Sequence, residues 1–103
     1  MVNVIIYLKK AHEPKRLVES LLIEKLVASA SIDYNNVSYK LVNSEIQEQE
    51  YNVITVQSKS LLFNEIVEFI EQQIEEEVPI ISTPIVGANR IFDSLIRSKT
   101  IPI

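Results

Sequence analysis

Acidic side chains form the densest chemical cluster in this chain of 103 residues. Five glutamates, Glu68, Glu71, Glu75, Glu76 and Glu77, fall on and just after a segment with helical periodicity. Carboxylates near a helix C-terminus oppose the helix dipole, and like charges three or four residues apart repel one another. A hard divalent cation such as magnesium or calcium would relieve that repulsion. We therefore predict a candidate metal site at Glu75, Glu76 and Glu77, with a solvated helix face as the simpler interpretation.

Other kinds of reactive group are scarce. His12 is the only histidine, so one chain cannot supply a multi-histidine metal site, although a threefold axis would collect three copies. The chain has no cysteine, which excludes disulfides and thiolate metal sites, and its single glycine excludes a glycine-rich phosphate loop. No nucleophile elbow is present. We predict that the protein is not an enzyme. A weaker alternative is an acylphosphatase-like enzyme, which would need an arginine near the first strand, where residues 9–12 read Lys-Lys-Ala-His.

Charge and hydropathy indicate which classes of binding partner and which cellular compartment to expect. The formal net charge is −4, and the bases fall in two small groups, so we predict no nucleic-acid partner. The apolar runs are too short to span a bilayer, and we predict no membrane association. The N-terminal residues lack a basic region and enter strand-like sequence directly, which argues against a signal peptide and favours the cytoplasm.

Periodicity predicts one domain over residues 1–103, with alternating strands and helices. Strands are expected at 2–8, 28–41, 46–57 and 80–86, and helices at 14–26, 61–74 and 91–96. Pro14 suits a first helical position, while Ser58 or Ser60 is a candidate N-cap. The single glycine, Gly87, lies between the last strand and the last helix, where we expect a positive φ or a close backbone approach.

The second and third strands form a long hairpin around the turn formers of residues 42–45. In the second strand, Ala28, Ala30, Ile32 and Tyr34 share one parity, whereas Val37, Tyr39 and Leu41 share the other. A period-two register cannot change parity without an extra residue, so a β-bulge is expected at Asn35-Asn36. The arms exceed the usual strand length of roughly five or six residues, and part of the hairpin should project beyond the helices.

The element order β-α-β-β-α-β, with a short C-terminal helix, predicts an α+β ferredoxin-like split βαβ sandwich. Both main helices then cover one sheet face. Adjacent apolar residues such as Val53 and Ile54, and an almost wholly apolar first strand, suggest that the second face is apolar too. Its burial against other subunits is the simplest arrangement. The tyrosines of the hairpin, Tyr34, Tyr39 and Tyr51, fit interface packing better than stacking on a ligand.

Three segments resemble the CutA divalent-ion tolerance family. They are residues 22–32 (LIEKLVASASI), residues 45–50 (EIQEQE), and the closing block made of Val78-Pro79 and residues 83–89 (TPIVGAN). The resemblance implies a ferredoxin-like subunit assembled as a homotrimer, related in architecture to PII-type signalling proteins. Ser29 stands where the family has a cysteine, so cysteine-based copper binding has no ligand in this chain.

The resemblance also implies four candidate ligand-binding residues. Lys40 lies where the family has an aromatic cluster, Gln57 replaces a lysine that ends the third strand, and Gly87 and Asn89 belong to the closing motif. We expect a trimer whose intersubunit clefts bind a small ligand or a divalent cation in a regulatory or homeostatic role. The alternative is a structural or protein-interaction module whose ligand cleft is vestigial.

Overall fold

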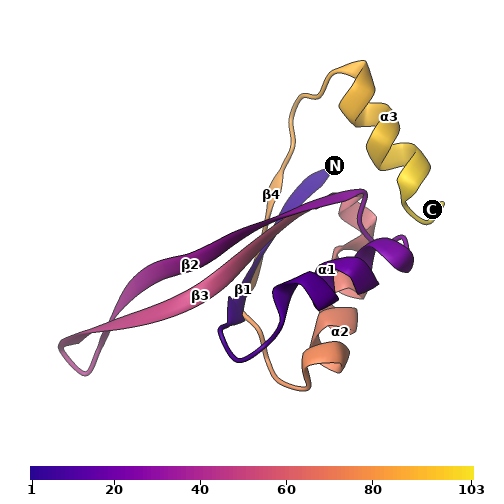
Figure 1. The fold of residues 1–103 in the computed structure, drawn as a ribbon. Coiled ribbons are helices and arrows are strands. Elements are labelled where there is room, and N and C mark those ends of the chain that lie inside the picture. Colours follow the sequence, from indigo (N-terminus) through magenta and orange to yellow (C-terminus); the bar gives the residue numbers. More distant parts are fainter.

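The computed structural model describes all residues from 1 to 103 and confirms the predicted fold class. In chain order the elements are β1 (Val2–Lys9), α1 (Pro14–Ile23), β2 (Ser29–Val42), β3 (Glu45–Ser58), a 3₁₀ turn (Ser60–Leu62), α2 (Phe63–Ile74), β4 (Ile80–Pro84) and α3 (Arg90–Lys99). The strands form one antiparallel sheet in the order β2-β3-β1-β4. Helices α1 and α2 lie on one face of that sheet (Figure 1).

The core lies between this sheet face and the two helices. Every second residue of β1, from Val2 to Leu8, is buried, and so are Ile54 and Val56 of β3. Leu17 and Leu21 of α1 and Ile66 and Ile70 of α2 join the same cluster. The period of two in the strands and the spacing of four in the helices thus bring two apolar faces together.

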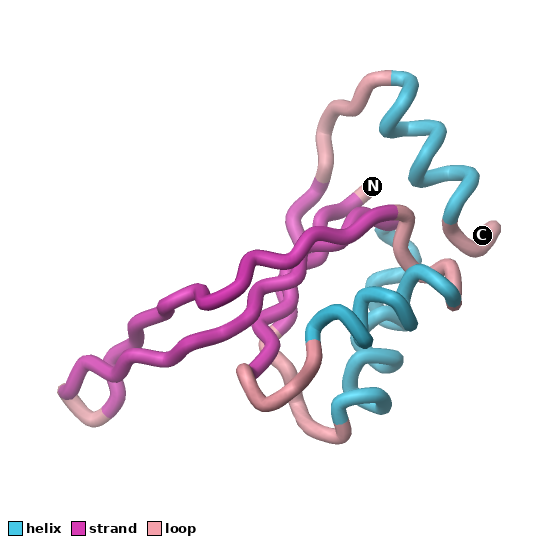
Figure 2. Tube along the Cα trace, in the orientation of Figure 1, coloured by secondary structure: helices cyan, strands magenta, loops and turns pink.

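The hairpin β2–β3 is the longest feature of the chain and extends well past the helices (Figure 2). Its turn has two central residues in the left-handed region, Asn43 at φ 50° and Ser44 at φ 65°, as a type I′ turn requires. The β2–β3 register shifts between Asp33 and Asn36, so the predicted bulge is confirmed. Asn35 has φ 61° within it.

The bulge keeps the apolar residues of the hairpin on one face. Before it, Ala30 and Ile32 pair with Val56 and Ile54, on the side that the helices cover. After it, Val37, Tyr39 and Leu41 pair with Glu50, Glu48 and Ile46, which continue the same parity along β3. Cross-strand partners share a face of the sheet. The extra residue of the bulge therefore places the apolar residues of β2 before and after it on the same face, although their parity in the sequence differs.

Several local predictions are wrong. Ser58 and Ser60 are not N-caps: the buried Ser58 hydroxyl donates to the Leu26 carbonyl, and the Ser60 hydroxyl accepts from the N-terminal ammonium group. A 3₁₀ turn precedes α2 and provides a hydrogen-bond acceptor for a backbone amide at the start of the helix. Strand β4 ends at Pro84, not at residue 86, because Pro84 already lies opposite Val2, the first residue of β1.

The sheet face opposite the helices is mixed, so its predicted apolar character holds only in part. Ile5, Tyr7, Val53 and Ile81 lie on this face. Beside them runs a row of polar residues, one from each strand, described below. Tyr7 and Tyr51 meet edge to face, with ring centroids 5.7 Å apart.

Helix α1 ends in a Schellman-type turn in which Lys25 occupies the left-handed position, at φ 58°. The Lys25 and Leu26 amides donate to the carbonyls of Leu22 and Leu21. An L-residue there costs roughly 1–2 kcal/mol, whereas glycine costs about 0.5–1 kcal/mol through its unfolded-state freedom. We expect Lys25→Gly to raise the free energy of unfolding by about 0.5–1 kcal/mol in urea denaturation. Lys25→Ala, which keeps the strain, should give no gain; an equal gain from it would contradict this reason.

Candidate functional site

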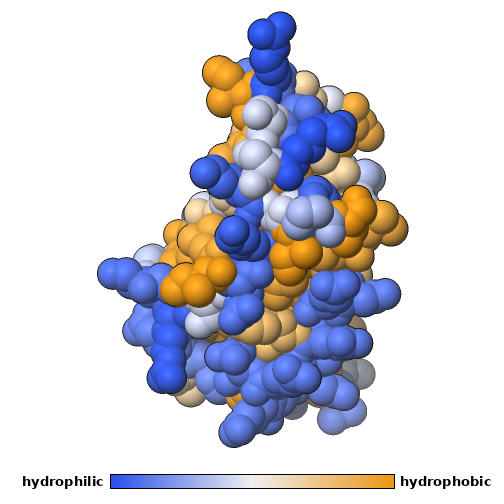
Figure 3. Space-filling view, turned by 90° about the vertical axis from the view of Figure 1, so that its right-hand side faces the viewer, coloured by the Kyte–Doolittle hydropathy of each residue, from blue (hydrophilic) through white to orange (hydrophobic).

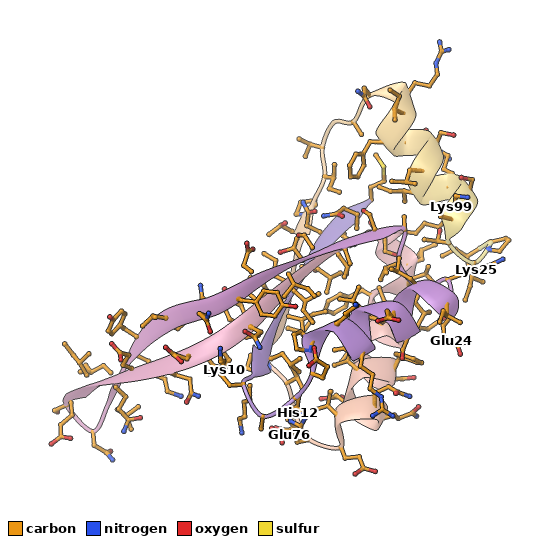
Figure 4. All side chains as sticks on the ribbon, in the orientation of Figure 1. Lys10, His12, Glu24, Lys25, Glu76 and Lys99 are labelled. Carbon is orange, nitrogen blue, oxygen red and sulfur yellow. The ribbon has the colours of Figure 1, made fainter.

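The predicted acidic site lies in the turn after α2, and its three carboxylates do not act together. Glu75 ends the helix with φ 62°, and its amide donates to the Glu71 carbonyl. Glu76 points to the loop after β1, with Lys9 Nζ 3.1 Å from one carboxylate oxygen and His12 Nε2 3.3 Å from the other. Figure 4 shows His12 and Glu76 together at this end of the molecule. No group of three or more acidic or histidine side chains converges within the chain.

The Glu76 contact has a testable pH dependence. Hydrogen bonds first from Lys9 and then from His12 lower the pKa of Glu76 below its ordinary value of 4.5. A lowered carboxyl pKa means that the pairing is fully present above the ordinary value and is lost as the pH falls through the lowered one. We expect a carbon-detected NMR titration of the Glu76 carboxyl to show a midpoint below 4.5, and Lys9→Met to move it upward. A wild-type midpoint at or above the ordinary value would contradict the pairing.

A cavity of about 380 Å³ lies beside this contact, between the β1–α1 loop, the first turns of α1 and the end of α2. His12 and Arg16 both line it, and the sequence analysis did not identify Arg16. Pro14 begins α1, so Arg16 lies in the first turn and its side chain can return toward the loop. The cavity also contains Glu13, whose carboxylate accepts from the Lys15 amide and caps the helix. A carboxylate that lines the same cavity as the guanidinium opposes the binding of a phosphate there.

The candidate ligand-binding residues are far apart within one chain. Lys40 lies opposite Gln47 near the hairpin tip, whereas Gln57 lies opposite Ser29 at the other end of β3. Ten residues of β3 separate these positions, or roughly 34 Å at about 3.4 Å per residue. One chain therefore does not bring Lys40 and Gln57 into one site.

Gly87 and Asn89 lie between β4 and α3. Asn89 has a local structural role, whereas Gly87 has none. The Asn89 side-chain oxygen accepts from the Phe92 amide at 3.0 Å, so Asn89 is the N-cap of α3. Gly87 does not have a positive φ, and a Cβ at this position would meet no atom within 4 Å. The expected backbone constraint at Gly87 is therefore wrong: a residue with a side chain would fit there.

Gln57 instead belongs to a row of polar side chains across the sheet face opposite the helices. Its amide oxygen accepts from the Ser29 hydroxyl at 2.5 Å, and its amide nitrogen donates to the Asn3 side-chain oxygen at 2.8 Å. Thr83 of β4 lies opposite Asn3 and completes the row. The row contains one residue from every strand, and the sequence analysis missed Asn3 and Thr83 because only the register aligns them.

No helix of the chain has the length and apolar character needed to cross a bilayer. The sequence model of the CutA1 divalent ion tolerance protein family matches residues 2–99. No curated protein sequence matches the chain significantly.

Several solved structures are similar to this chain in fold at low sequence identity. CutA1 from Pyrococcus horikoshii is 18% identical, with a TM-score of 0.85 over 98% of this chain and 99% of that one. A divalent cation tolerance protein from Thermus thermophilus is 20% identical, with a TM-score of 0.85 over 97% and 99%. CutA1 from Oryza sativa is 24% identical, with a TM-score of 0.81 over 97% and 91%. At these identities the likeness shows a shared fold.

Proposed function

This chain belongs to the CutA1 divalent ion tolerance family, and we propose that it is a non-catalytic homotrimer whose neighbouring copies together form a binding site. The ligand is a divalent cation or a small polar molecule, and the role is homeostatic or regulatory. The family match over residues 2–99 carries this proposal. The separation of the candidate residues supports it, since Lys40 and Gln57 lie at opposite ends of β3 and cannot share a ligand within one chain.

The sheet face opposite the helices supports assembly. It combines exposed Ile81 with half-buried Ile5 and Tyr7, and it carries the hydrogen-bonded row of Gln57, Ser29 and Asn3. Polar groups whose hydrogen bonds are already made can be buried at little cost against another subunit. A face of this kind suits a subunit interface that stays hydrated at its polar row.

Native mass spectrometry of protein purified without added metal tests the proposal. We expect a trimer that carries stoichiometric extra mass, or that acquires it when magnesium or calcium is added. A bare trimer that binds neither ion and co-purifies with no small molecule would favour the alternative function, a protein-interaction module. A monomer at every concentration would overturn the trimer.

Removal of the three acidic side chains tests the cation site separately. If Glu75, Glu76 and Glu77 bind a cation in the assembly, their joint change to glutamine should weaken magnesium or calcium binding by roughly tenfold or more in calorimetric titrations. The matched control changes Glu65 and Glu68, which are exposed on α2, to glutamine. Equal affinities for wild type and the triple variant would remove these residues from the proposal.

A further inference from the structure

A second cavity, of about 320 Å³, lies where the end of α1 and the segment before β2 meet the last turns of α3, and it shares no residue with the cavity beside His12. Its apolar lining consists of Leu22, Val27, Ala28 and Leu95. Val27 is 1% exposed and Ala28 is 9% exposed, so they form the floor, whereas Leu22 is 39% exposed at the rim. Sites for small molecules have volumes of roughly 300–1,000 Å³, and this cavity has the size of a small one.

Contacts within the chain fix the walls of this cavity. Ile96 of α3 has no exposed surface, so the last turns of this helix pack against the rest of the domain. Beyond the helix, the Ile101 amide donates to the Lys25 carbonyl at 2.9 Å, and the Ile101 carbonyl accepts from Lys59 Nζ at 2.9 Å. The end of α3 accordingly lies close to the end of α1 (Figure 1). The cavity is therefore preformed in a single copy of the chain.

Two lysines, Lys25 and Lys99, line the cavity together with these apolar residues, and no acidic side chain lines it. Neither lysine belongs to any ion pair of the chain. Figure 4 shows both on the side of the molecule where α1 and α3 end. Figure 3 faces that side and shows apolar side chains at the surface among polar ones. Two uncompensated cations beside an apolar lining favour a ligand that is anionic at one end and apolar at the other.

The two helix ends beside the cavity do not cancel this positive charge. A helix C-terminus carries partial negative charge on carbonyls that have no partner. In α1 the carbonyls of Ser20, Leu21 and Leu22 accept from backbone amides of the turn that follows. In α3 the hydroxyls of Ser98 and Thr100 donate to carbonyls one turn earlier. Because these carbonyls already have donors, the lysine ammonium groups remain available to a ligand.

We infer that this cavity binds a small amphipathic anion, whose carboxylate or phosphate head contacts Lys25 and Lys99 and whose short apolar body contacts Leu22 and Leu95. The site lies within one chain, so it goes beyond the proposed site between copies and does not depend on the homotrimer. Both lysines are exposed, so each ion pair contributes modestly, and added salt should weaken the binding.

Titration with hexanoate, followed by the NMR shifts of the backbone amides, tests the inference. Saturable shifts should be confined to residues 22–28 and 95–101. Lys25→Gln and Lys99→Gln should each weaken hexanoate binding by roughly twofold to fivefold, and the double variant by roughly tenfold. Lys15→Gln is the matched control, since it removes the same charge from α1 outside this cavity, and it should bind hexanoate as the wild type does. Hexanol, which lacks the charge, and acetate, which lacks the apolar body, should both bind more weakly than hexanoate.

A cavity-filling variant separates this site from a general attraction of anions to lysines. Ser98 lines the cavity from α3 and is exposed, so Ser98→Phe should abolish hexanoate binding although both lysines remain. Hexyl phosphate, titrated in the same way, identifies the preferred head group by its affinity relative to hexanoate. Shifts that never saturate, or hexanoate binding that is unchanged in the double lysine variant, would overturn the site. A monomer in native mass spectrometry that still binds hexanoate would overturn the homotrimer alone.

Discussion

Replacing Ile54 with alanine should lower the free energy of unfolding by about 2–5 kcal/mol. Ile54 has no exposed surface, and it lies in β3 between Ile6 of β1 and Ile32 of β2, beneath the two helices. Deletion of a buried branched side chain removes its transfer free energy and leaves a cavity that the sheet cannot close. Since domains of this size are stable by roughly 5–15 kcal/mol, this change should remove a large share of the stability.

Urea denaturation at one fixed protein concentration measures this effect, because assembly makes the apparent stability depend on concentration. Ile23→Ala is the matched control: the same atoms are removed from a side chain that is 76% exposed at the end of α1. Its effect should remain within about 0.5 kcal/mol. A loss of less than about 1 kcal/mol for Ile54→Ala would contradict the placement of Ile54 in the centre of the core.

The fold could be predicted because its main signals are local. Alternation in β1 and four-residue spacing in the helices identify the buried faces directly. The parity change around Asn35 and Asn36 located the bulge, because a strand can absorb such a change only by adding a residue. Likewise, the polar residues Asn43 and Ser44 located the hairpin turn.

The single glycine does not mark a constrained backbone position, and the reason is physical. Five residues adopt a positive φ, namely Lys25, Asn35, Asn43, Ser44 and Glu75, and the single glycine is not among them. A left-handed L-residue costs roughly 1–2 kcal/mol, which the hydrogen bonds of a helix end or a hairpin turn can outweigh. In a chain that uses glycine once, the position of glycine therefore says little about where the backbone is constrained.

The candidate site was harder to predict because it depends on register and on more than one element. Asn3, Gln57, Ser29 and Thr83 are scattered along the sequence, and only the pairing of four strands places them in one row. The contact of Glu76 with Lys9 and His12 likewise depends on how the turn after α2 meets the loop after β1. Residue types alone could not show that Lys9 and His12 are partners of Glu76.

The bulge depends on Asn52, and Asn52→Ala should cost about 1–3 kcal/mol. Asn52 is 5% exposed, and its side-chain oxygen accepts from the Asn35 amide at 3.2 Å. It faces the extra residue of β2, so its removal leaves the Asn35 amide without a partner in a partly buried place. Without this anchor the outer hairpin can slip by one residue, which would turn its apolar stripe to the other face.

Hydrogen exchange separates this effect from a general loss of stability. In Asn52→Ala, amides of residues 36–50 should exchange faster by a larger factor than amides of β1, because the hairpin loses its register while the core persists. Asn35→Gly keeps the amide and relieves the left-handed strain, so its hairpin should stay protected. If protection of the hairpin is equal in Asn52→Ala and wild type, the bulge is held by the strand pairing alone and Asn52 is a replaceable core residue.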